Sequence, residues 1–365
     1  MDVLNIMWSG GTAFVSVQKV HRDILRHTGP GAEVETLLLQ AGAAEPLAGI
    51  GPVTSVGLNA GRIKGRGLGA MRRLLDQRRL RAWIFERQPG ILLLDGIGVA
   101  AFVLPLLRNI PVARAVVLFH GAKRLKPAEV DLLSSFPENR VMLAAVSDTL
   151  AADLESQSGC AVRGCRVAIE PCAFRSALWK REAARNALGL GESRKRVIGA
   201  VGRLVAEKGF ELLLVAMADW LVENPEDHLV IVGDGPERQR LAEKARRLGI
   251  ADQVSLVGHH PSAPQLYLAF DLVCIPSEQE GLGLVLPEAV IAGVPVLASD
   301  LPVFREQLSG SAGLVPFGDL AHWQNALRQA LSGEAGQLAE AQRSGLNPEA
   351  AWLNFVAACR KLLVA

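Results

Sequence analysis

Two glutamates flank an apolar, glycine-containing turn in the second half of the chain. The stretch SEQEGLGLVLPEAVIAGVPVLASD carries Glu280 before the turn and Glu288 after it. A carboxylate accepts hydrogen bonds from paired hydroxyls, such as those of a ribose or a hexose. The helix dipole also favours an acid in a first turn, by ~0.3–1 kcal/mol, but that simpler explanation covers Glu288 and not Glu280. The pair therefore predicts a sugar-binding site.

The same turn has the features of an anion site. We expect a helix to begin near Leu284, so that the amides of residues 283–286 lack intrahelical acceptors and carry the positive end of the helix dipole. Pro287 removes only a donor that would be unpaired there. Gly281 and Gly283 let a ligand approach the backbone closely. A phosphate or a carboxylate fits such a helix start.

Two cationic residues follow the strand expected at 197–201. Arg203 and Lys208 lie five residues apart in GRLVAEKGF, so both side chains can reach one anion. Together they suit a diphosphate, because charge-assisted hydrogen bonds are about twice as strong as neutral ones. The alternative is a solvated loop with a local Arg203–Glu207 pair. His259, in VGHH after a further strand, is another candidate ligand-binding residue.

Short apolar runs without alternation recur along the chain and predict buried strands. They alternate with helix-length segments such as Thr12–His27, Phe210–Val222 and Glu237–Leu248, which is the pattern of parallel sheets covered on both faces. We therefore expect an α/β protein with two doubly wound, Rossmann-like domains of five strands each. The expected strands are Val3–Trp8, Val34–Leu39, Ile91–Leu94, Ala115–Phe119, Met142–Val146, Val197–Val201, His228–Val232, Val254–Val257, Leu272–Ile275 and Pro295–Ala298.

The length of 365 residues also suggests two domains. We place the first at residues 1–170 and the second at 171–347, with the last helix, 348–365, packing back on the first. Residues 1–185 carry 24 Lys and Arg against 16 Asp and Glu. The first half is therefore the better partner for an anionic ligand.

Several segments of the second half, taken together, resemble a known family. They are similar to the nucleotide-sugar domain of retaining glycosyltransferases with the GT-B fold, of the family 4 type. The resemblance implies two Rossmann-like domains with a cleft between them, the first binding the acceptor and the second the sugar nucleotide. The segments are GRLVAEKGFELLL, VGDGPERQRL, VSLVGHH, PSEQEGLGLVLPEAVIAGVPVLASD and AGLV, between Val197 and Pro316.

The resemblance also implies a role for each residue. The linker departs from the family pattern, because EPCAFRSALW has Cys172 and Ala173 where relatives have Asn and Gly. The implied roles are ribose binding for Glu288, donor-sugar binding for Glu280, diphosphate binding for Arg203 and Lys208, and contact of the Gly283 and Leu284 amides with the distal phosphate.

Two features of the first half are candidates for the same site. Ser9, Gly10 and Gly11 follow the first expected strand, and in the family a Gly-Gly turn there approaches the diphosphate or the acceptor; sterics alone also place glycines in such a turn. His120 ends the strand at 115–119 in LFHGAKR, where a histidine of many relatives touches the donor sugar. A packed or solvated histidine is the alternative.

Residues 61–87 form a basic stretch interleaved with apolar residues. They include nine Lys or Arg and two acids. Such a surface suits anionic lipid head groups or a phosphorylated glycolipid. An ordinary helix with its apolar side in the core and its arginines in solvent is an equal alternative. Nucleic acid is disfavoured, because single-strand binders add aromatic stacking platforms and the chain has one tyrosine.

The composition favours a cytoplasmic protein. Its five cysteines form no C-x-x-C pair and have no histidine at ligand spacing, so we expect reduced thiols and no metal. The first residues lack the pattern of a secretion signal. We expect residues 91–107 to form a buried strand and a core helix, not a membrane span. Peripheral contact with the cytoplasmic face of the inner membrane is compatible with the basic stretch.

The expected function is hexosyl transfer from a nucleotide diphosphate sugar, with retention at the anomeric carbon. The resemblance favours UDP as the nucleotide and a saccharide or glycolipid acceptor, as in lipopolysaccharide or other cell-surface glycan assembly. No D-x-D element is present, so we expect no metal and no other cofactor. Alternatives are a GT-B epimerase or phosphorylase, and a non-catalytic sugar-nucleotide-binding partner. An NAD-dependent oxidoreductase is disfavoured because no G-x-G-x-x-G follows the first strand.

Overall fold

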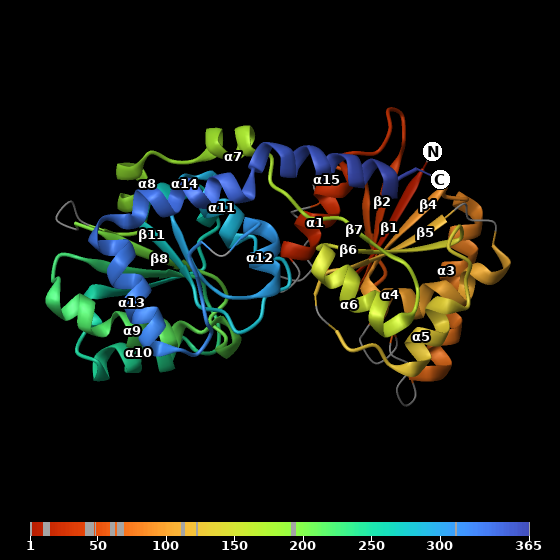
Figure 1. Ribbon diagram of the computed structural model, residues 1–365. Helices are drawn as coiled ribbons and strands as arrows, with labels where there is room; N and C mark the ends of the chain where they lie inside the picture. Colours follow the sequence, from red (N-terminus) through yellow and green to blue (C-terminus); the bar gives the residue numbers. More distant parts are fainter. Residues whose placement is uncertain are drawn as a thin grey trace. The chain divides into compact units, whose positions relative to one another are not determined.

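The chain forms two compact units, each built on a parallel sheet (Figure 1). The computed structural model describes residues 2–9, 15–40, 47, 49–58, 63, 69–110, 114–121, 123–190, 195–310 and 312–364. The first unit contains residues 1–167 and 353–365, and the second contains residues 168–352. Both are α/β units with Rossmann-like doubly wound sheets, which confirms the predicted fold class.

The first sheet has the strand order β3-β2-β1-β4-β5-β6-β7, and its neighbouring strands are parallel. The order reverses between β1 and β4, because β2 and β3 lie on one side of β1 and the later strands on the other. The strands are β1 (Val3–Ser9), β2 (Val34–Gln40), β3 (Val53–Ser55), β4 (Ile91–Asp95), β5 (Arg114–Phe119), β6 (Val141–Ala145) and β7 (Val162–Gly164).

The second sheet has the order β10-β9-β8-β11-β12-β13, again parallel. Here the order reverses between β8 and β11. The strands are β8 (Val197–Val201), β9 (His228–Val232), β10 (Val254–Gly258), β11 (Leu272–Ile275), β12 (Val296–Ser299) and β13 (Leu314–Val315).

Helices connect the strands of each sheet (Figure 1). In the first unit they are α1 (Val15–Leu25), α3 (Gly69–Arg87), α4 (Gly96–Val103), η3 (Leu104–Asn109), α5 (Pro127–Ser134) and α6 (Asp148–Ser158). From the second unit onward they are α7 (Pro171–Ala177), α8 (Arg181–Ala187), η4 (Ala206–Lys208), α9 (Phe210–Glu223), α10 (Arg238–Arg247), η5 (Ala251–Gln253), η6 (Ala263–Gln265), η7 (Tyr267–Ala269), α11 (Val285–Ile291), α12 (Pro302–Leu308), α13 (Leu320–Gln329), η8 (Ala330–Glu334), α14 (Ala335–Leu346) and α15 (Pro348–Leu362).

The apolar strands of the second sheet bury both of their faces. Successive side chains of a strand point to opposite faces, so Leu229 and Ile231 of β9 join one core cluster while Val230 and Val232 join another. In Figure 1, α9, α10 and α13 cover the first of these faces, and α8 and α11 lie on the other. Double coverage explains why these strands show apolar runs and no alternation.

The end of the chain packs on the first unit. From Leu353 onward the chain belongs to that unit, and Phe355 and Cys359 are fully buried there. The Phe355 ring meets His27 edge-on at 6.2 Å between ring centroids. The Arg114 guanidinium donates a hydrogen bond of 2.8 Å to the carbonyl of Val364.

The predicted number of strands was wrong, because the described residues contain seven and six strands instead of five in each sheet. The strands that the sequence missed are β3, β7 and β13, with two or three residues each. Runs of two or three residues are too short to show a periodic hydrophobic pattern. They are strands because their backbone pairs with a neighbouring strand. The segment at 91–107 does form a buried strand and a core helix, as predicted. Among the described residues, no helix is both long and apolar enough to span a bilayer.

Candidate functional site

The predicted residues of the second unit lie at the point where its strand order reverses. Strands β8 and β11 are neighbours, with Ile198 paired to Leu272. Arg203 and Lys208 follow β8, and Glu280 follows β11. In open α/β sheets, ligands bind beyond the carboxyl ends of the strands at such a switch point. The topology therefore places these side chains at the expected ligand-binding edge.

Backbone contacts lock the two loops of this switch point together. The amide of Glu278 donates a hydrogen bond of 2.8 Å to the carbonyl of Glu207. Gly209 adopts a positive φ of 66°, and a Cβ atom at this position would collide with the carbonyl group of Pro276. Only glycine suits such a position without strain. The close approach fixes Lys208 relative to the loop that carries Glu280.

Lys208 and Glu280 form an ion pair across these loops. The Lys208 Nζ atom lies 2.5 Å from Glu280 Oε1. The Ser277 hydroxyl donates to the same oxygen at 2.8 Å. The Glu280 side chain is 10% exposed and that of Lys208 is 22% exposed, so water screens the pair only partly. The two groups that the sequence assigned to the sugar and the diphosphate are thus held side by side.

Glu288 is oriented by a buried tyrosine that sequence reasoning missed. It lies in the first turn of α11, and the Tyr267 hydroxyl donates a hydrogen bond of 2.7 Å to its Oε2 atom. Burial, together with the nearby Glu288 carboxylate, raises the pKa of Tyr267 well above its usual value. Tyr267 therefore stays a neutral donor that fixes one carboxylate oxygen. A lone tyrosine between strands gave no sequence signal.

The start of α11 differs in one respect from the expected anion site. The helix begins at Val285, and Gly283 has a φ of 57° with the Phe304 ring against it. The amide of Leu286, which was expected to be free, donates to the carbonyl of Gly283 at 3.1 Å. A tight turn at Gly283 creates this bond. The predicted set of free amides at residues 283–286 is wrong for Leu286.

Arg203 and His259 occupy exposed positions at the same edge of the sheet. Arg203 lies in the loop after β8, and His259 directly follows β10. Within the described part of the chain, the Arg203 guanidinium makes no ion pair, so the alternative Arg203–Glu207 pair does not form. Gly281 lies in the loop before α11 and is half-buried. In the described part of the chain, no hydrogen bond or ion pair joins Arg203 or His259 to Glu280.

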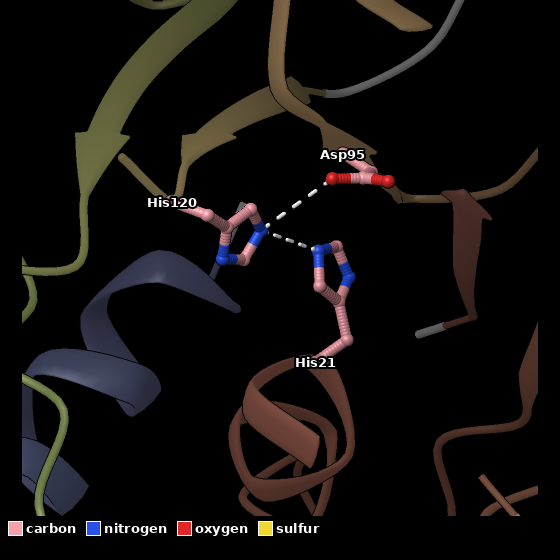
Figure 2. A group of neighbouring side chains, drawn as sticks. All are labelled: His21, Asp95 and His120. Carbon is pink, nitrogen blue, oxygen red and sulfur yellow. Dashed lines mark hydrogen bonds and ion pairs between the residues drawn. The ribbon is translucent and has the colours of Figure 1, made fainter. Parts of the chain in front are cut away.

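In the first unit, His120 belongs to a buried polar cluster (Figure 2). His120 directly follows β5, Asp95 ends β4 and His21 lies on α1. The Nε2 atoms of the two histidines are 3.0 Å apart, and His120 Nε2 is 3.6 Å from Asp95 Oδ1. Sequence reasoning identified His120 but missed the other two. Asp95 could have been predicted from its position at the end of a strand, whereas His21, in the middle of a helix, could not.

Burial determines the charges in this cluster. It lowers the pKa of His120 to about 3 and, with the nearby His120, lowers that of His21 well below its usual value. Burial also raises the pKa of Asp95 to about 6, an effect opposed by the hydrogen bond from the Trp8 amide. At neutral pH both imidazoles are therefore uncharged and the carboxylate is mostly ionised. The predicted Gly10 and Gly11 turn lies outside the described residues.

Comparison with known proteins finds relatives for the second unit. Residues 180–345 match the model of the family described as glycosyl transferases group 1. The match lies within the second unit. A segment of 171 residues is 33% identical to the lipopolysaccharide core biosynthesis mannosyltransferase LpsB of Rhizobium meliloti, and it covers 45% of this chain and 48% of that protein. The chain spans less than half the length of the curated relatives that it matches first.

Solved structures show the same fold over the whole chain. Anabaena HepE, solved in complex with UDP, is similar with a TM-score of 0.75 at 19% identity, covering 99% of this chain and 98% of that one. WaaG, a glycosyltransferase involved in lipopolysaccharide biosynthesis, is similar with a TM-score of 0.70 at 17% identity and complete coverage of both chains. The chain therefore has the GT-B fold.

We predict that Gly209→Ala destabilises the protein by about 2–5 kcal/mol, since a left-handed alanine costs about 1–2 kcal/mol and overpacking adds about 1–3 kcal/mol. Gly249→Ala is the matched control, because Gly249 has a similar φ of 72° with nothing near the added Cβ atom. Urea unfolding followed by circular dichroism measures both variants. Equal losses would contradict the role of the contact with Pro276.

We also predict that Lys208→Met lowers the free energy of unfolding by about 1–3 kcal/mol, because it leaves the Glu280 carboxylate short of a partner at a mostly buried position. Lys244→Met is the control, since Lys244 pairs with Glu211 at 3.3 Å where the side chains are 30% and 39% exposed. The control should lose less than about 1 kcal/mol. If both variants unfolded at the same urea concentration, the proposed contribution of the buried pair would be refuted.

Proposed function

We propose that the protein is a retaining glycosyltransferase that moves a hexosyl group from a UDP-linked sugar to a saccharide or glycolipid acceptor. The observation that carries this proposal is the Lys208–Glu280 pair at the switch point of the second sheet. It holds a phosphate-binding cation beside a hydroxyl-binding carboxylate. The pair lies within the segment that matches the glycosyltransferase family.

In this proposal the second unit binds the donor along one edge of its sheet. Glu288 accepts hydrogen bonds from the ribose hydroxyls and Glu280 from the donor-sugar hydroxyls. Lys208 and Arg203 bind the diphosphate, and the amides of Gly283 and Leu284 contact its distal phosphate. His259 contributes a further polar contact. The exposure of the Arg203 guanidinium supports its role in diphosphate binding, because it has no competing ion pair among the described residues.

The Lys208–Glu280 pair also suggests how the donor is recognised. A diphosphate attracts the Lys208 ammonium, while a sugar hydroxyl donates to Glu280 in place of the ammonium. Ser277 keeps one hydrogen bond to Glu280 during this exchange. Only a ligand that offers an anion and hydroxyls at the correct separation replaces both halves of the ion pair. Inorganic phosphate or a free sugar replaces one half and leaves the other unpaired, which costs free energy.

Catalysis in this proposal is electrostatic. Arg203, Lys208 and the turn before α11 stabilise the negative charge that develops on the leaving diphosphate. The acceptor attacks from the face of the leaving group, and a phosphate oxygen takes the acceptor's proton, so the anomeric configuration is retained. The diphosphate then needs no Mg²⁺. Contact of His120 with the donor sugar stays a prediction.

The acceptor class rests on the relatives. LpsB is named for lipopolysaccharide core biosynthesis, and WaaG is described as acting in lipopolysaccharide biosynthesis. We propose an acceptor in cell-surface glycan assembly, reached at an anionic membrane. Helix α3 supports the membrane contact, because Leu74, Leu75 and Phe85 are 63%, 56% and 54% exposed there. Residues 61, 62 and 64–68 of the predicted basic stretch lie outside the described residues.

The exposed side of α3 combines large apolar side chains with arginines. Leu74, Arg78, Arg81 and Phe85 recur at spacings of four, three and four residues and are all exposed, so they share one face of the helix. Leu80 and Ile84 are buried on the other side. Part of the apolar side of α3 therefore joins the core, and part of it stays exposed beside the arginines. Such a face suits the boundary between head groups and acyl chains.

We predict that UDP raises the thermal midpoint of the protein in buffer without Mg²⁺, because a ligand that binds the native state stabilises it. Glu288→Gln should weaken UDP binding about 10- to 150-fold, the value of a hydrogen bond to a charged group of about 1.5–3 kcal/mol. Glu280→Gln should leave UDP binding nearly unchanged and abolish transfer from UDP-hexoses to a glycan acceptor. Titration calorimetry and product analysis measure the two effects.

Glu243→Gln is the control for these variants, because Glu243 lies on α10 away from the candidate site, where it pairs with Arg247 at 3.6 Å and accepts a hydrogen bond of 3.0 Å from Gln239. It should match the native protein in both assays. Tight UDP binding without any transferred product would favour the non-catalytic alternative, and conversion of the UDP-sugar without an acceptor would favour an epimerase. Unchanged UDP affinity in Glu288→Gln would remove Glu288 from the site.

We predict that the protein binds vesicles containing anionic phospholipid and that Arg78→Ala with Arg81→Ala weakens this binding about 10- to 50-fold, since each basic residue near such a surface contributes about 1 kcal/mol. The control pair is Arg240→Ala with Arg246→Ala on α10, which is also basic and exposed but has no large exposed apolar residue. Vesicle co-sedimentation at low salt measures both. Equal weakening by the two pairs would mean nonspecific charge attraction and would contradict a membrane face on α3.

A further inference from the structure

The buried cluster of the first unit brings three metal-ligand types together. His21, Asp95 and His120 are far apart in the sequence, yet their donor atoms all lie within 4.8 Å of one another (Figure 2). The Nε2–Nε2 distance is 3.0 Å and the distance from His120 Nε2 to Asp95 Oδ1 is 3.6 Å. Ligands of a tetrahedral zinc ion with bonds of about 2.0–2.1 Å are separated by about 3.3 Å. These two separations lie on either side of this value, and the third, between His21 and Asp95, is at most 4.8 Å.

The hydrogen bonds around His21 fix its tautomer. The Asn5 side-chain amide donates to the Thr36 hydroxyl at 3.2 Å, so the Asn5 oxygen faces His21 Nδ1, 2.7 Å away. His21 Nδ1 must therefore carry the hydrogen, and His21 Nε2 presents a lone pair toward His120. Metal-binding histidines nearly always donate their second ring N–H to an oxygen in this way.

Asp95 is held in a comparable manner. Its Oδ2 atom accepts the backbone amide of Trp8 at 3.1 Å, which leaves Oδ1 as the oxygen on the side of His120 (Figure 2). The Asp95 side chain is 10% exposed and that of His120 is 11% exposed. The carboxylate thus has a fixed orientation and little access to water.

A proton cannot satisfy all three facing groups. His120 Nε2 can donate one hydrogen to His21 Nε2, but the 3.6 Å separation from Asp95 Oδ1 is beyond hydrogen-bond range. His120 Nδ1 is buried without a hydrogen-bond partner among the described residues in either state, as an acceptor in the hydrogen-bonded form and as an N–H donor in the metal-bound form, so it does not distinguish the two. A cation between the three groups would instead use every lone pair that faces the centre. Two neutral imidazoles and a carboxylate are ligands typical of zinc and unlike the all-oxygen sets of calcium or magnesium.

The position of the cluster also suits a ligand. Trp8 lies near the end of β1 and Asp95 ends β4, so the three side chains lie where the strand order of the first sheet reverses. Three protein ligands leave a fourth tetrahedral position for water or a substrate oxygen. We propose that His21, Asp95 and His120 bind one divalent transition-metal ion of the zinc class at this switch point. The proposal does not depend on the glycosyltransferase assignment.

The test uses the full chain, stripped of metal and then dialysed against Zn²⁺ or Co²⁺ without any sugar nucleotide. We expect one equivalent of Zn²⁺ at micromolar concentration. The Co²⁺ form should show the visible absorption of a four-coordinate ion without the near-ultraviolet charge-transfer band of a cobalt–thiolate bond, which excludes the five free cysteines. X-ray absorption of the zinc form should show nitrogen and oxygen neighbours and no sulfur.

His21→Gln and Asp95→Asn should each lower the affinity for Zn²⁺ by at least about 100-fold, since even outer-shell changes cost 10- to 100-fold. His322→Asn is the matched control, because it removes an exposed His–Asp pair with an Nδ1–Oδ2 distance of 2.6 Å; its Zn²⁺ binding should equal that of the native chain. Circular dichroism of the metal-free variants checks folding.

Failure to bind an equivalent of Zn²⁺, a sulfur neighbour in the X-ray absorption, or native affinity in both folded variants would overturn the proposal. If the variants fail to fold, the stoichiometry and X-ray absorption of the native chain decide the question alone. A native chain that binds no metal would make the cluster a hydrogen-bonded chain from Thr36 to His120. None of these outcomes bears on UDP binding, which is measured separately.

Discussion

Both candidate sites depend on one constraint of parallel sheets. Neighbouring parallel strands end at the same edge, and where the strand order reverses the connecting segments leave in opposite directions, which opens a crevice at that edge. In the second unit this brings the loop after β8 to the loop after β11, and thus Lys208 to Glu280. In the first unit it brings the end of β1 to the end of β4, and thus the Trp8 amide to Asp95. The polar residues differ, but the same geometry assembles each group.

The two sites differ in how the protein treats charge. In the second unit a cation and an anion neutralise each other at a partly exposed edge, so an arriving ligand can exchange with either partner at moderate cost. In the first unit, burial lowers the pKa of His21 and His120, so both stay neutral, and it raises the pKa of Asp95. The ion pair of the second unit suits a charged ligand with many hydroxyls. The neutral histidines and the carboxylate of the first unit suit a cation that accepts their lone pairs. The two sheets share one topology, but the side chains at their switch points differ in charge and burial.

The fold class and most of the longer strands were predictable, because double coverage of a parallel sheet leaves a direct mark in the sequence. The apolar runs that became β8, β9 and β11 were placed at their observed bounds. The short strands β3, β7 and β13 were not predictable, since sheet pairing and not composition defines them. Among the residues of the candidate sites, Lys208 and Glu280 were predicted from residue type and position after a strand, and the structure shows that they pair. Tyr267 and His21 were missed because their roles depend on contacts across the fold, which no local pattern records.

The first unit is discontinuous in the sequence, since it consists of residues 1–167 and the tail from Leu353. Phe355, Cys359 and Leu362 of that tail are buried. A fragment that stopped at Val167 would therefore expose the apolar surface that these side chains cover. An exchange of one unit with that of a relative therefore needs two junctions, one near Val167 and one near Trp352, if the tail is to stay with the unit on which it packs.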